Sequence, residues 1–234
     1  MSAACSLSIV VPCWNDATAL RGLLGKLAKL DGIAEVVVGD ASETEQCRLI
    51  AAGFQASVVP CPRPNRGAQM NAGARATTGT MLLFQHADTE LTQAHVDALH
   101  ATIRDPDVIG GAFHRKFDQR HARLRWLEAV ARRMNERGST LYGDQSIFVR
   151  RATFGQLGGY AEIPLMEDLE FSKRLRRAGR TVVLDPPIAS SARHHERRGA
   201  LRTSIRNGLM IALFRLGMSP QRLHTWYYRG FAPH

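Results

Sequence analysis

The segment FQHADTE (84–90) presents a histidine and an aspartate directly after the apolar run MLLFQ. A carboxylate at Asp88 is the kind of ligand that holds a divalent cation on a diphosphate. Imidazole is a poor ligand for Mg²⁺ but an acceptable one for Mn²⁺, so His86 either adds a second ligand or contacts a ribose or a phosphate. On its own, His86 is equally well explained as an ordinary loop histidine.

Two earlier apolar runs also end in residues that could contact a ligand. The run SIVV is followed by PCWND, and EVVVGD ends at Asp40. The ring of Trp14 could stack on a base, and Asp40 could accept hydrogen bonds from a base or a ribose. The structural alternatives are that Asn15 or Asp16 caps the next helix and that Asp40 starts an Asx turn. Taken together, the three run ends predict a nucleoside-diphosphate site.

The elements that position these residues alternate between strand and helix. Continuous β-branched runs predict buried strands, and leucines at helical spacing predict helices. The order β-α-β-α-β-α-β predicts an α/β protein with a parallel, doubly wound sheet, which binds ligands beyond the carboxyl ends of its strands. The predicted strands are 7–12, 35–40, 56–60 and 81–85, and the predicted helices are 16–30, 43–53 and 67–79.

Two further carboxylates lie in the second half of the chain. The segment DLEFSKRLRRAG predicts a helix that ends at Gly179 and begins at Asp168. A carboxylate there is a good cap, but an accessible one could also take a proton from a nucleophile. Upstream, YGDQSIFVRR leads into a predicted strand, and its Asp144 and Gln145 either bind sugar hydroxyls or form a turn.

Composition indicates one folded domain. The chain has 234 residues, of which 44% are hydrophobic and 22% charged, as is usual for a globular protein. Its four cysteines lack CxxC spacing, and neither a signal peptide nor a membrane-spanning run is apparent, so we expect reduced thiols and a cytoplasmic protein.

Positive charge is concentrated in the second half of the chain. Residues 1–110 hold 8 Lys and Arg against 11 Asp and Glu, whereas residues 111–234 hold 23 against 10. Predicted helices at 119–138 and 198–217 either pack on the domain or on a second subunit of a homodimer, or lie at the inner membrane face. Because no nucleic-acid motif matches and aromatic residues make up 7%, we expect no nucleic-acid partner.

The motifs together resemble glycosyltransferase family 2, whose members have the GT-A fold. The resemblance covers about residues 5–190, and FQHADTE stands where the family has its DxD motif. Within the family, the chain looks most like the bacterial branch that accompanies radical-SAM proteins and is linked to arsenosugar assembly. The motifs are SIVVPCWND, VVVGDASE, RGAQMNAGARATTG, FQHADTE and GGYAEIPLMEDLEFSKRLRRAGR.

The resemblance implies transfer of a sugar, with inversion, from a nucleoside-diphosphate sugar such as a UDP-sugar to an unidentified acceptor, with Mg²⁺ or Mn²⁺. Asp168 would be the base and Glu167 its companion. The metal ligands would be Asp88, His86 and His194. His195 is an equal alternative to His194, and the structural alternative is that both histidines belong to a surface loop. The implied nucleotide and donor contacts are Pro12, Trp14, Asn15, Asp40, Arg66, Asn71, His86, Ala87 and Asp88, and the acceptor contacts are Asp144 and Gln145.

The chain departs from the family pattern at two positions. His86 replaces the usual first aspartate of the DxD motif, and Gly39 precedes Asp40 where a doublet of aspartates is common. We expect a glycosyltransferase domain at 1–190, divided into a nucleotide part (1–90) and an acceptor part (91–190), with a basic helical extension at 191–234. The alternatives are a nucleotide-sugar-binding protein without catalysis and a basic binder of membranes or nucleic acid.

Overall fold

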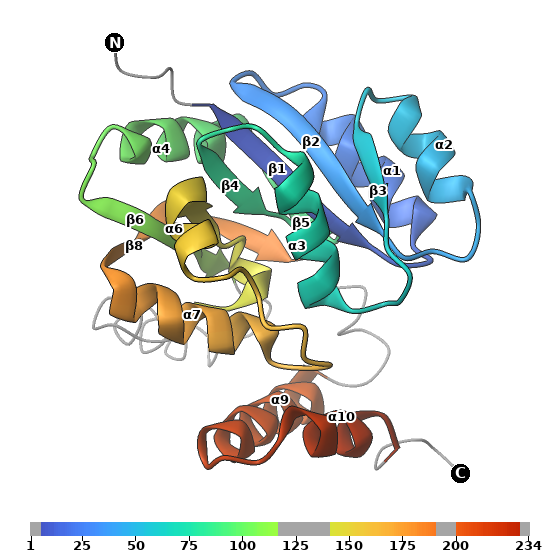
Figure 1. The fold of residues 1–234 in the computed structure, drawn as a ribbon, viewed down its shortest axis with the longest axis vertical. Helices are drawn as coiled ribbons and strands as arrows, with labels where there is room; N and C mark the ends of the chain where they lie inside the picture. Colours follow the sequence, from blue (N-terminus) through green and yellow to red (C-terminus); the bar gives the residue numbers. More distant parts are fainter. Residues whose placement is uncertain (1–5, 117–140, 191–199, 230–234) are drawn as a thin grey trace.

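The computed structural model describes residues 6–116, 141–190 and 200–229 (Figure 1). Its centre is an eight-stranded sheet in the order β3-β2-β1-β4-β7-β6-β8-β5. Neighbours from β3 to β4 are parallel, β7 is antiparallel to both its neighbours, and β6 and β8 are parallel again. The strands are β1 (Leu7–Cys13), β2 (Ile33–Asp40), β3 (Ser57–Pro60), β4 (Met81–Phe84), β5 (Thr89–Glu90), β6 (Val108–Lys116), β7 (Phe148–Arg150) and β8 (Arg180–Ser190).

The predicted β-α-β-α-β-α-β order of the first half is confirmed. The connecting helices are α1 (Ala17–Leu27), α2 (Gln46–Ala52) and α3 (Arg66–Ala76). Asp16 caps α1, since its side chain accepts a hydrogen bond from Ala19 N at 3.1 Å. The predicted mostly parallel sheet of an α/β fold is confirmed, with β7 running antiparallel between β4 and β6.

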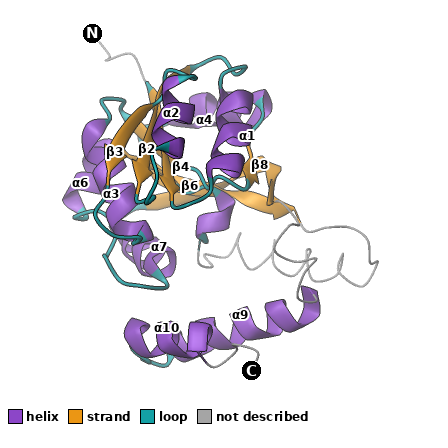
Figure 2. Ribbon diagram, turned by 90° about the vertical axis from the view of Figure 1, so that its right-hand side faces the viewer, coloured by secondary structure: helices purple, strands orange, loops and turns teal. Residues whose placement is uncertain are grey.

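Helices cover both faces of the sheet (Figure 2). On one face α1, α2 and α4 (Gln93–Ile103) bury apolar side chains such as Leu20, Ile50 and Leu99 against the strands. On the other face α3, α6 (Arg151–Gln156) and α7 (Glu167–Ala178) pack around Phe84 and Phe171. A strand buried on both faces needs apolar residues throughout, which explains the continuous runs in the sequence.

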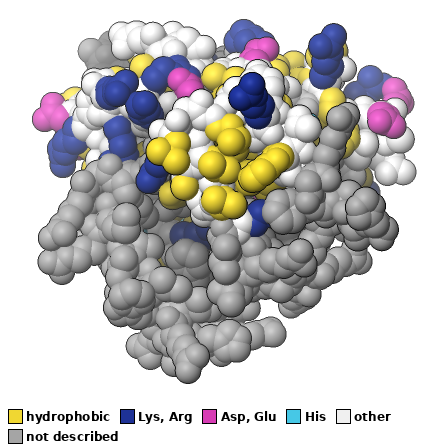
Figure 3. Space-filling model, turned by 90° about the horizontal axis from the view of Figure 1, so that it is seen from below, with side chains coloured by type: hydrophobic (Ala, Val, Ile, Leu, Met, Phe, Trp, Pro, Cys, Tyr) yellow, Lys and Arg dark blue, Asp and Glu magenta, His cyan; other side chains and the backbone are white. Residues whose placement is uncertain are grey.

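Two C-terminal helices, α9 (Ala200–Arg215) and α10 (Pro220–Arg229), lie below the edge of the sheet where α3 and α7 begin (Figure 1). Seen from below, hydrophobic side chains gather there among lysines and arginines (Figure 3). No helix within the described ranges combines the length and the apolar character that crossing a bilayer requires. The helix expected at 119–138 and the histidines at 194 and 195 lie outside the described residues. The large exposed hydrophobic residues of this region are Leu209, Trp226 and Tyr228 on the two helices and Leu216 in the turn between them.

Candidate active site at the carboxyl edge of the sheet

The loops after β1 and β2 are tied together at the carboxyl edge of the sheet. Asn15 has a φ of 51°, its N–H donates to Ser42 Oγ at 2.9 Å, and its side-chain oxygen accepts from Glu43 N at 3.2 Å. Asp40 Oδ1 accepts a hydrogen bond from Ser42 N at 3.0 Å. This bond forms the Asx turn that was the structural alternative for Asp40. The Asp40 carboxylate is nevertheless half-buried rather than enclosed, so a ligand can still reach it.

One buried side chain of α3 fixes the spacing of these two strand ends. Gln69 Nε2 donates to Cys13 O at 2.6 Å and to Gly39 O at 3.0 Å. A Cβ atom added at Gly39 would collide with the backbone oxygen of Gln69. This close approach explains why position 39 is a glycine, where an aspartate is common in the family. Trp14 is 54% exposed beside it, and Pro12 pairs with Gly39 across the strands.

The loop after β4 is held by a buried glutamine. Gln85 accepts a hydrogen bond from Ser146 Oγ at 2.7 Å and donates one to Thr89 O at 3.0 Å. These two bonds fix both ends of the short turn that contains His86, Ala87 and Asp88. Ala87 and His86 are half-buried and Asp88 is exposed, so the Asp88 carboxylate points to where a ligand can approach.

Asp168 connects α7 to the one-turn helix η1 (Gly143–Gln145). Its Oδ2 accepts from Gly143 N at 2.8 Å, and its Oδ1 accepts from Leu169 N at 2.8 Å. The residue at the cap position is Met166, with a φ of 70°, so Asp168 lies inside the first turn. The simple capping alternative is therefore wrong.

Gly143 separates the predicted base from His86. A Cβ atom at Gly143 would lie 3.0 Å from His86 Nε2 and 3.2 Å from Asp168 Oδ2. Both side chains therefore face the same point in space. Burial, together with the positive charge of Arg66, lowers the pKa of His86 to about 4 although Asp88 opposes the shift. The imidazole is thus neutral near pH 7 and has a lone pair to offer.

Glu167 is buried and paired with the first residue of α3. Its Oε1 lies 3.1 Å from the Arg66 guanidinium, whose side chain is half-exposed. Burial raises the pKa of Glu167, and Arg66 only partly offsets that effect. Burial would lower the pKa of Arg66, but the carboxylates of Glu167 and Asp168 outweigh it and raise that pKa. A permanent positive charge is thus held beside both acidic residues.

Asp144 has one carboxylate oxygen in use and one without a partner. Oδ2 lies 3.0 Å from Arg115, whereas Oδ1 is buried and accepts no hydrogen bond from the described part of the chain. Burial raises the pKa of Asp144, Arg115 opposes the rise, and the negative charges of Asp168 and Asp88 add to it. An unpaired buried oxygen is costly, so this one favours contact with a ligand hydroxyl or ion.

The donors at the end of β4 fit a divalent cation in part. Asp88 offers an exposed carboxylate and His86 a neutral imidazole, a pair that suits Mn²⁺ better than Mg²⁺. Within the described ranges, the one group of three ligand atoms within 4.8 Å of one another lies elsewhere, at Cys13, Asp40 and Cys47. An ion at Asp88 would therefore need further oxygen ligands, and a bound diphosphate supplies them.

Two predicted site residues are engaged in holding the fold. Asn71 is buried, donates to Tyr160 O at 2.9 Å and accepts from Tyr160 N at 2.8 Å. Gln145 is also buried and accepts from Tyr142 N at 2.9 Å. Because the side-chain nitrogen and oxygen of Asn71 both already bond to the backbone of Tyr160, the expected contact of Asn71 with the sugar donor stays a prediction.

The structure also adds site residues that the sequence did not indicate. Gly143 and Arg115 orient the acidic side chains, and Gln69 and Gln85 hold the loops. Each acts through a partner many positions away in the sequence. Tyr228 of α10 is close enough to Arg66 to influence its pKa, so the C-terminal helices approach the same edge.

Comparisons with known proteins agree on one family and one fold. Residues 8–156 match the model of the family described as glycosyl transferase family 2. No curated protein sequence matches the chain.

Three solved structures illustrate the likeness of fold. The fragment 1–349 of S. aureus TarS has a TM-score of 0.65 at 16% identity, over 96% of this chain and 72% of that one. A mannosyltransferase from Pyrobaculum calidifontis, in complex with GDP-Man and Mn²⁺, gives 0.68 at 20%, over 97% and 70%. Glucosyl-3-phosphoglycerate synthase from Mycobacterium tuberculosis, with Mn²⁺, UDP and glucosyl-3-phosphoglycerate, gives 0.61 at 20%, over 92% and 81%.

Proposed function

The chain belongs to glycosyl transferase family 2 and has the GT-A fold, and from this we propose that it transfers a sugar from a nucleoside-diphosphate sugar to an acceptor by a single inverting displacement. The proposal rests mainly on one observation: Asp168, Asp88 and the ion pair between Glu167 and Arg66 lie together at one edge of the sheet. A base, a fixed positive charge and a metal-binding carboxylate are the parts that this displacement requires.

The donor lies over the ends of β1, β2 and β4 in this proposal. Exposed Trp14 stacks on the base, and the open oxygen of Asp40 accepts a hydrogen bond from it. Arg66 lies at the start of α3 and contacts the diphosphate. Structures of the same fold contain UDP-GlcNAc, UDP or GDP-Man, and we propose a UDP-sugar as the donor.

Asp88 and His86, with a histidine at 194 or 195 as a further ligand, would hold a divalent cation, which would supply positive charge to the leaving diphosphate. Arg66 contributes a second, permanent positive charge to the same phosphates. The neutral state of His86 favours Mn²⁺ over Mg²⁺, and several solved structures of this fold contain Mn²⁺.

Asp168 takes the proton from the acceptor hydroxyl. The hydrogen bond from Gly143 N holds its carboxylate toward the space that it shares with His86. As the proton leaves, the acceptor oxygen attacks the anomeric carbon and the nucleoside diphosphate departs from the opposite face. Glu167 stays paired with Arg66 and so positions the base and the phosphate-binding side chain together.

The acceptor lies on the side of η1. The unpaired Oδ1 of Asp144 accepts a hydrogen bond from an acceptor hydroxyl, and Arg115 keeps that carboxylate in place. The approach of Tyr228 to Arg66 makes α10 the neighbouring wall of this side. From the sequence motifs alone, we also propose that the acceptor is of the kind used by the arsenosugar branch of the family.

A peripheral membrane contact of a cytoplasmic enzyme is the second proposal for this region. Leu209, Trp226 and Tyr228 are exposed on α9 and α10, and Leu216 is exposed in the turn between them. Both helices also contain arginines, and hydrophobic side chains lie beside Lys and Arg on this side of the molecule (Figure 3), a combination typical of helices that rest on anionic lipid. A homodimer that covers the same face is the alternative. Binding to anionic vesicles, compared with the oligomeric state in solution, separates the two.

Thermal unfolding with UDP, GDP or TDP, with and without Mn²⁺, tests the proposed function. We expect one nucleotide to raise the melting temperature only with the cation, because Asp88 contacts the phosphates through that ion. An Asp88→Ala variant should lose this stabilisation, whereas Asp97→Asn, an exposed carboxylate on α4, should keep it. Equal stabilisation in excess chelator would contradict the metal assignment.

A further inference from the structure

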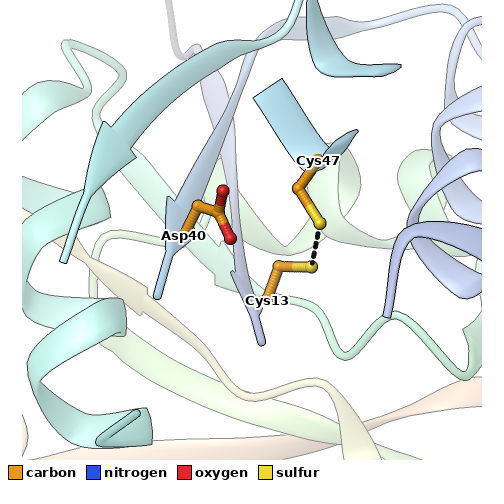
Figure 4. Close-up of side chains that lie close together, drawn as sticks. All are labelled: Cys13, Asp40 and Cys47. Atoms are coloured by element: carbon orange, nitrogen blue, oxygen red, sulfur yellow. Dashed lines mark hydrogen bonds between the residues drawn. The ribbon is translucent and has the colours of Figure 1, made fainter. Parts of the chain in front are cut away.

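Two buried thiols and a carboxylate meet beside the proposed base-binding residue (Figure 4). Cys13 ends β1, Cys47 lies in the first turn of α2, and Asp40 ends β2. The Cys13 and Cys47 sulfur atoms are 3.4 Å apart, and each lies within 4.8 Å of an Asp40 oxygen. None of these contacts is needed for the proposed transfer reaction.

The spacing of the sulfur atoms fits a metal ion better than a disulfide. A disulfide requires about 2.05 Å between sulfurs, whereas two thiolates at about 2.3 Å from one tetrahedral zinc stand about 3.7 Å apart. The observed 3.4 Å needs a shift of only a few tenths of an ångström to reach that value. Ser42 Oγ lies 3.3 Å from the Cys47 sulfur and offers one more oxygen beside the three ligands.

The surroundings select a soft cation and give it one route of entry. Both cysteines are almost fully buried, and Asp40 and Ser42 are half-buried, so an ion arrives from the side of the carboxylate. Sulfur ligands exclude Mg²⁺ and favour Zn²⁺ or Cd²⁺. Burial and the hydrogen bond with Cys47 raise the pKa of Cys13 to about 12, so the Cys13 thiol is protonated in the absence of a metal.

We propose that Cys13, Cys47 and Asp40 form a binding site for a thiophilic divalent cation such as Zn²⁺. Each thiol loses its proton as its bond to the metal forms, so two protons leave per ion, and nothing is oxidised or reduced. The ion takes the Asp40 oxygen that the proposed function assigns to the nucleotide base. The site therefore makes donor binding sensitive to zinc, and this last step rests on the proposed function.

Cadmium titration of the nucleotide-free protein tests the site directly, because a thiolate-to-cadmium bond absorbs in the ultraviolet. With a phosphine reductant present, we expect one equivalent of Cd²⁺ to produce this band. The band should disappear in Cys47→Ala and in Cys47→Ser, which keeps a polar group of similar size. Cys61→Ala is the matched control, since Cys61 is half-buried near Asp40 and its thiol donates to Val59 O.

A band that persists in both Cys47 variants, with folding checked by circular dichroism, would overturn the site. The coupling is tested separately with UDP in saturating Mn²⁺, to which Zn²⁺ is added. At Zn²⁺ concentrations of about 100 times its Kd, competition should weaken UDP binding about 100-fold in the wild type and not in Cys47→Ala. Unchanged UDP affinity would refute the competition alone. If none of UDP, GDP and TDP binds in Mn²⁺, the proposed function fails while the cadmium result still decides the site.

Discussion

Replacing Asp168 with asparagine should greatly reduce catalysis while leaving the fold and the donor site in place. The wild-type carboxylate accepts hydrogen bonds from both Gly143 N and Leu169 N, each at 2.8 Å. Asparagine has one carbonyl oxygen, so one of these donors keeps its acceptor and the other loses it. Hydrogen bonds to charged groups contribute about 1.5–3 kcal/mol, so the free energy of unfolding should fall by about 2 kcal/mol.

The catalytic effect is expected to be larger than the effect on stability. Loss of a general base reduces rates by about 10²–10⁴-fold, which corresponds to about 2.7–5.5 kcal/mol in the activation barrier. The UDP affinity should stay close to that of the wild type, because Trp14, Asp40 and Arg66 are unaltered.

The assay is sugar transfer to a competent acceptor, or slow release of free sugar from the donor until an acceptor is known. The control is Glu167→Gln, which breaks the pair with Arg66 and should weaken nucleotide binding as well as turnover. Normal transfer by Asp168→Asn would refute the assignment of the base and direct attention to Glu167. Water as the acceptor need not use the same base, so transfer is the decisive measurement.

Three further predictions concern the supporting residues. Gly143→Ala should lower turnover at least about tenfold without unfolding the protein, because its Cβ would press on His86 and Asp168; steady-state kinetics beside a melting curve checks this. Asp40→Ala should weaken UDP binding but leave the melting temperature of the free protein nearly unchanged, and calorimetry measures both. Burial raises the pKa of Glu35, but hydrogen bonds from Thr78, Ser8 and Gly79 outweigh it and lower that pKa. The stabilisation that ionised Glu35 contributes is therefore present above about pH 4.5 and is lost as the pH falls through the lower pKa of the folded state. Glu35→Gln should lower the free energy of unfolding by about 1–2 kcal/mol at pH 7. Urea unfolding at several pH values should then show a weaker dependence of stability on pH.

The first half of the fold could be predicted because its strands are buried on both faces. Runs such as SIVV and EVVV need no partner information to be recognised, and each is followed by a helix. The direction of β7 could not be predicted in the same way. Phe148 and Val149 read equally well as a parallel or an antiparallel strand, and the choice depends on the pairing with β4 and β6.

The candidate site shows the same limit at the level of single residues. Asp168 was predicted as either a cap or a base; Met166 occupies the cap position, and the role as base stays a prediction. Its bond to Gly143, 25 positions away, could not be predicted from local sequence. Asn71 belongs to a motif of the family, but its partner Tyr160 is 89 positions away and nothing near Asn71 indicates it. Residue type and local spacing identify which groups reach the edge of the sheet. They do not show which of those groups are already occupied.

The helix α3 explains why the donor and catalytic parts of the site act as one unit. Gln69 bonds to the ends of β1 and β2, where the base is expected, while Arg66 on the preceding turn pairs with Glu167 beside the catalytic carboxylate. The absence of a side chain at Gly39 lets the helix lie directly against the strand. A substitution such as Gly39→Ala would push α3 away from the sheet, and because both contacts belong to one rigid helix, it should weaken nucleotide binding and turnover together. Loss of only one of the two would show that the two halves of the site are positioned independently.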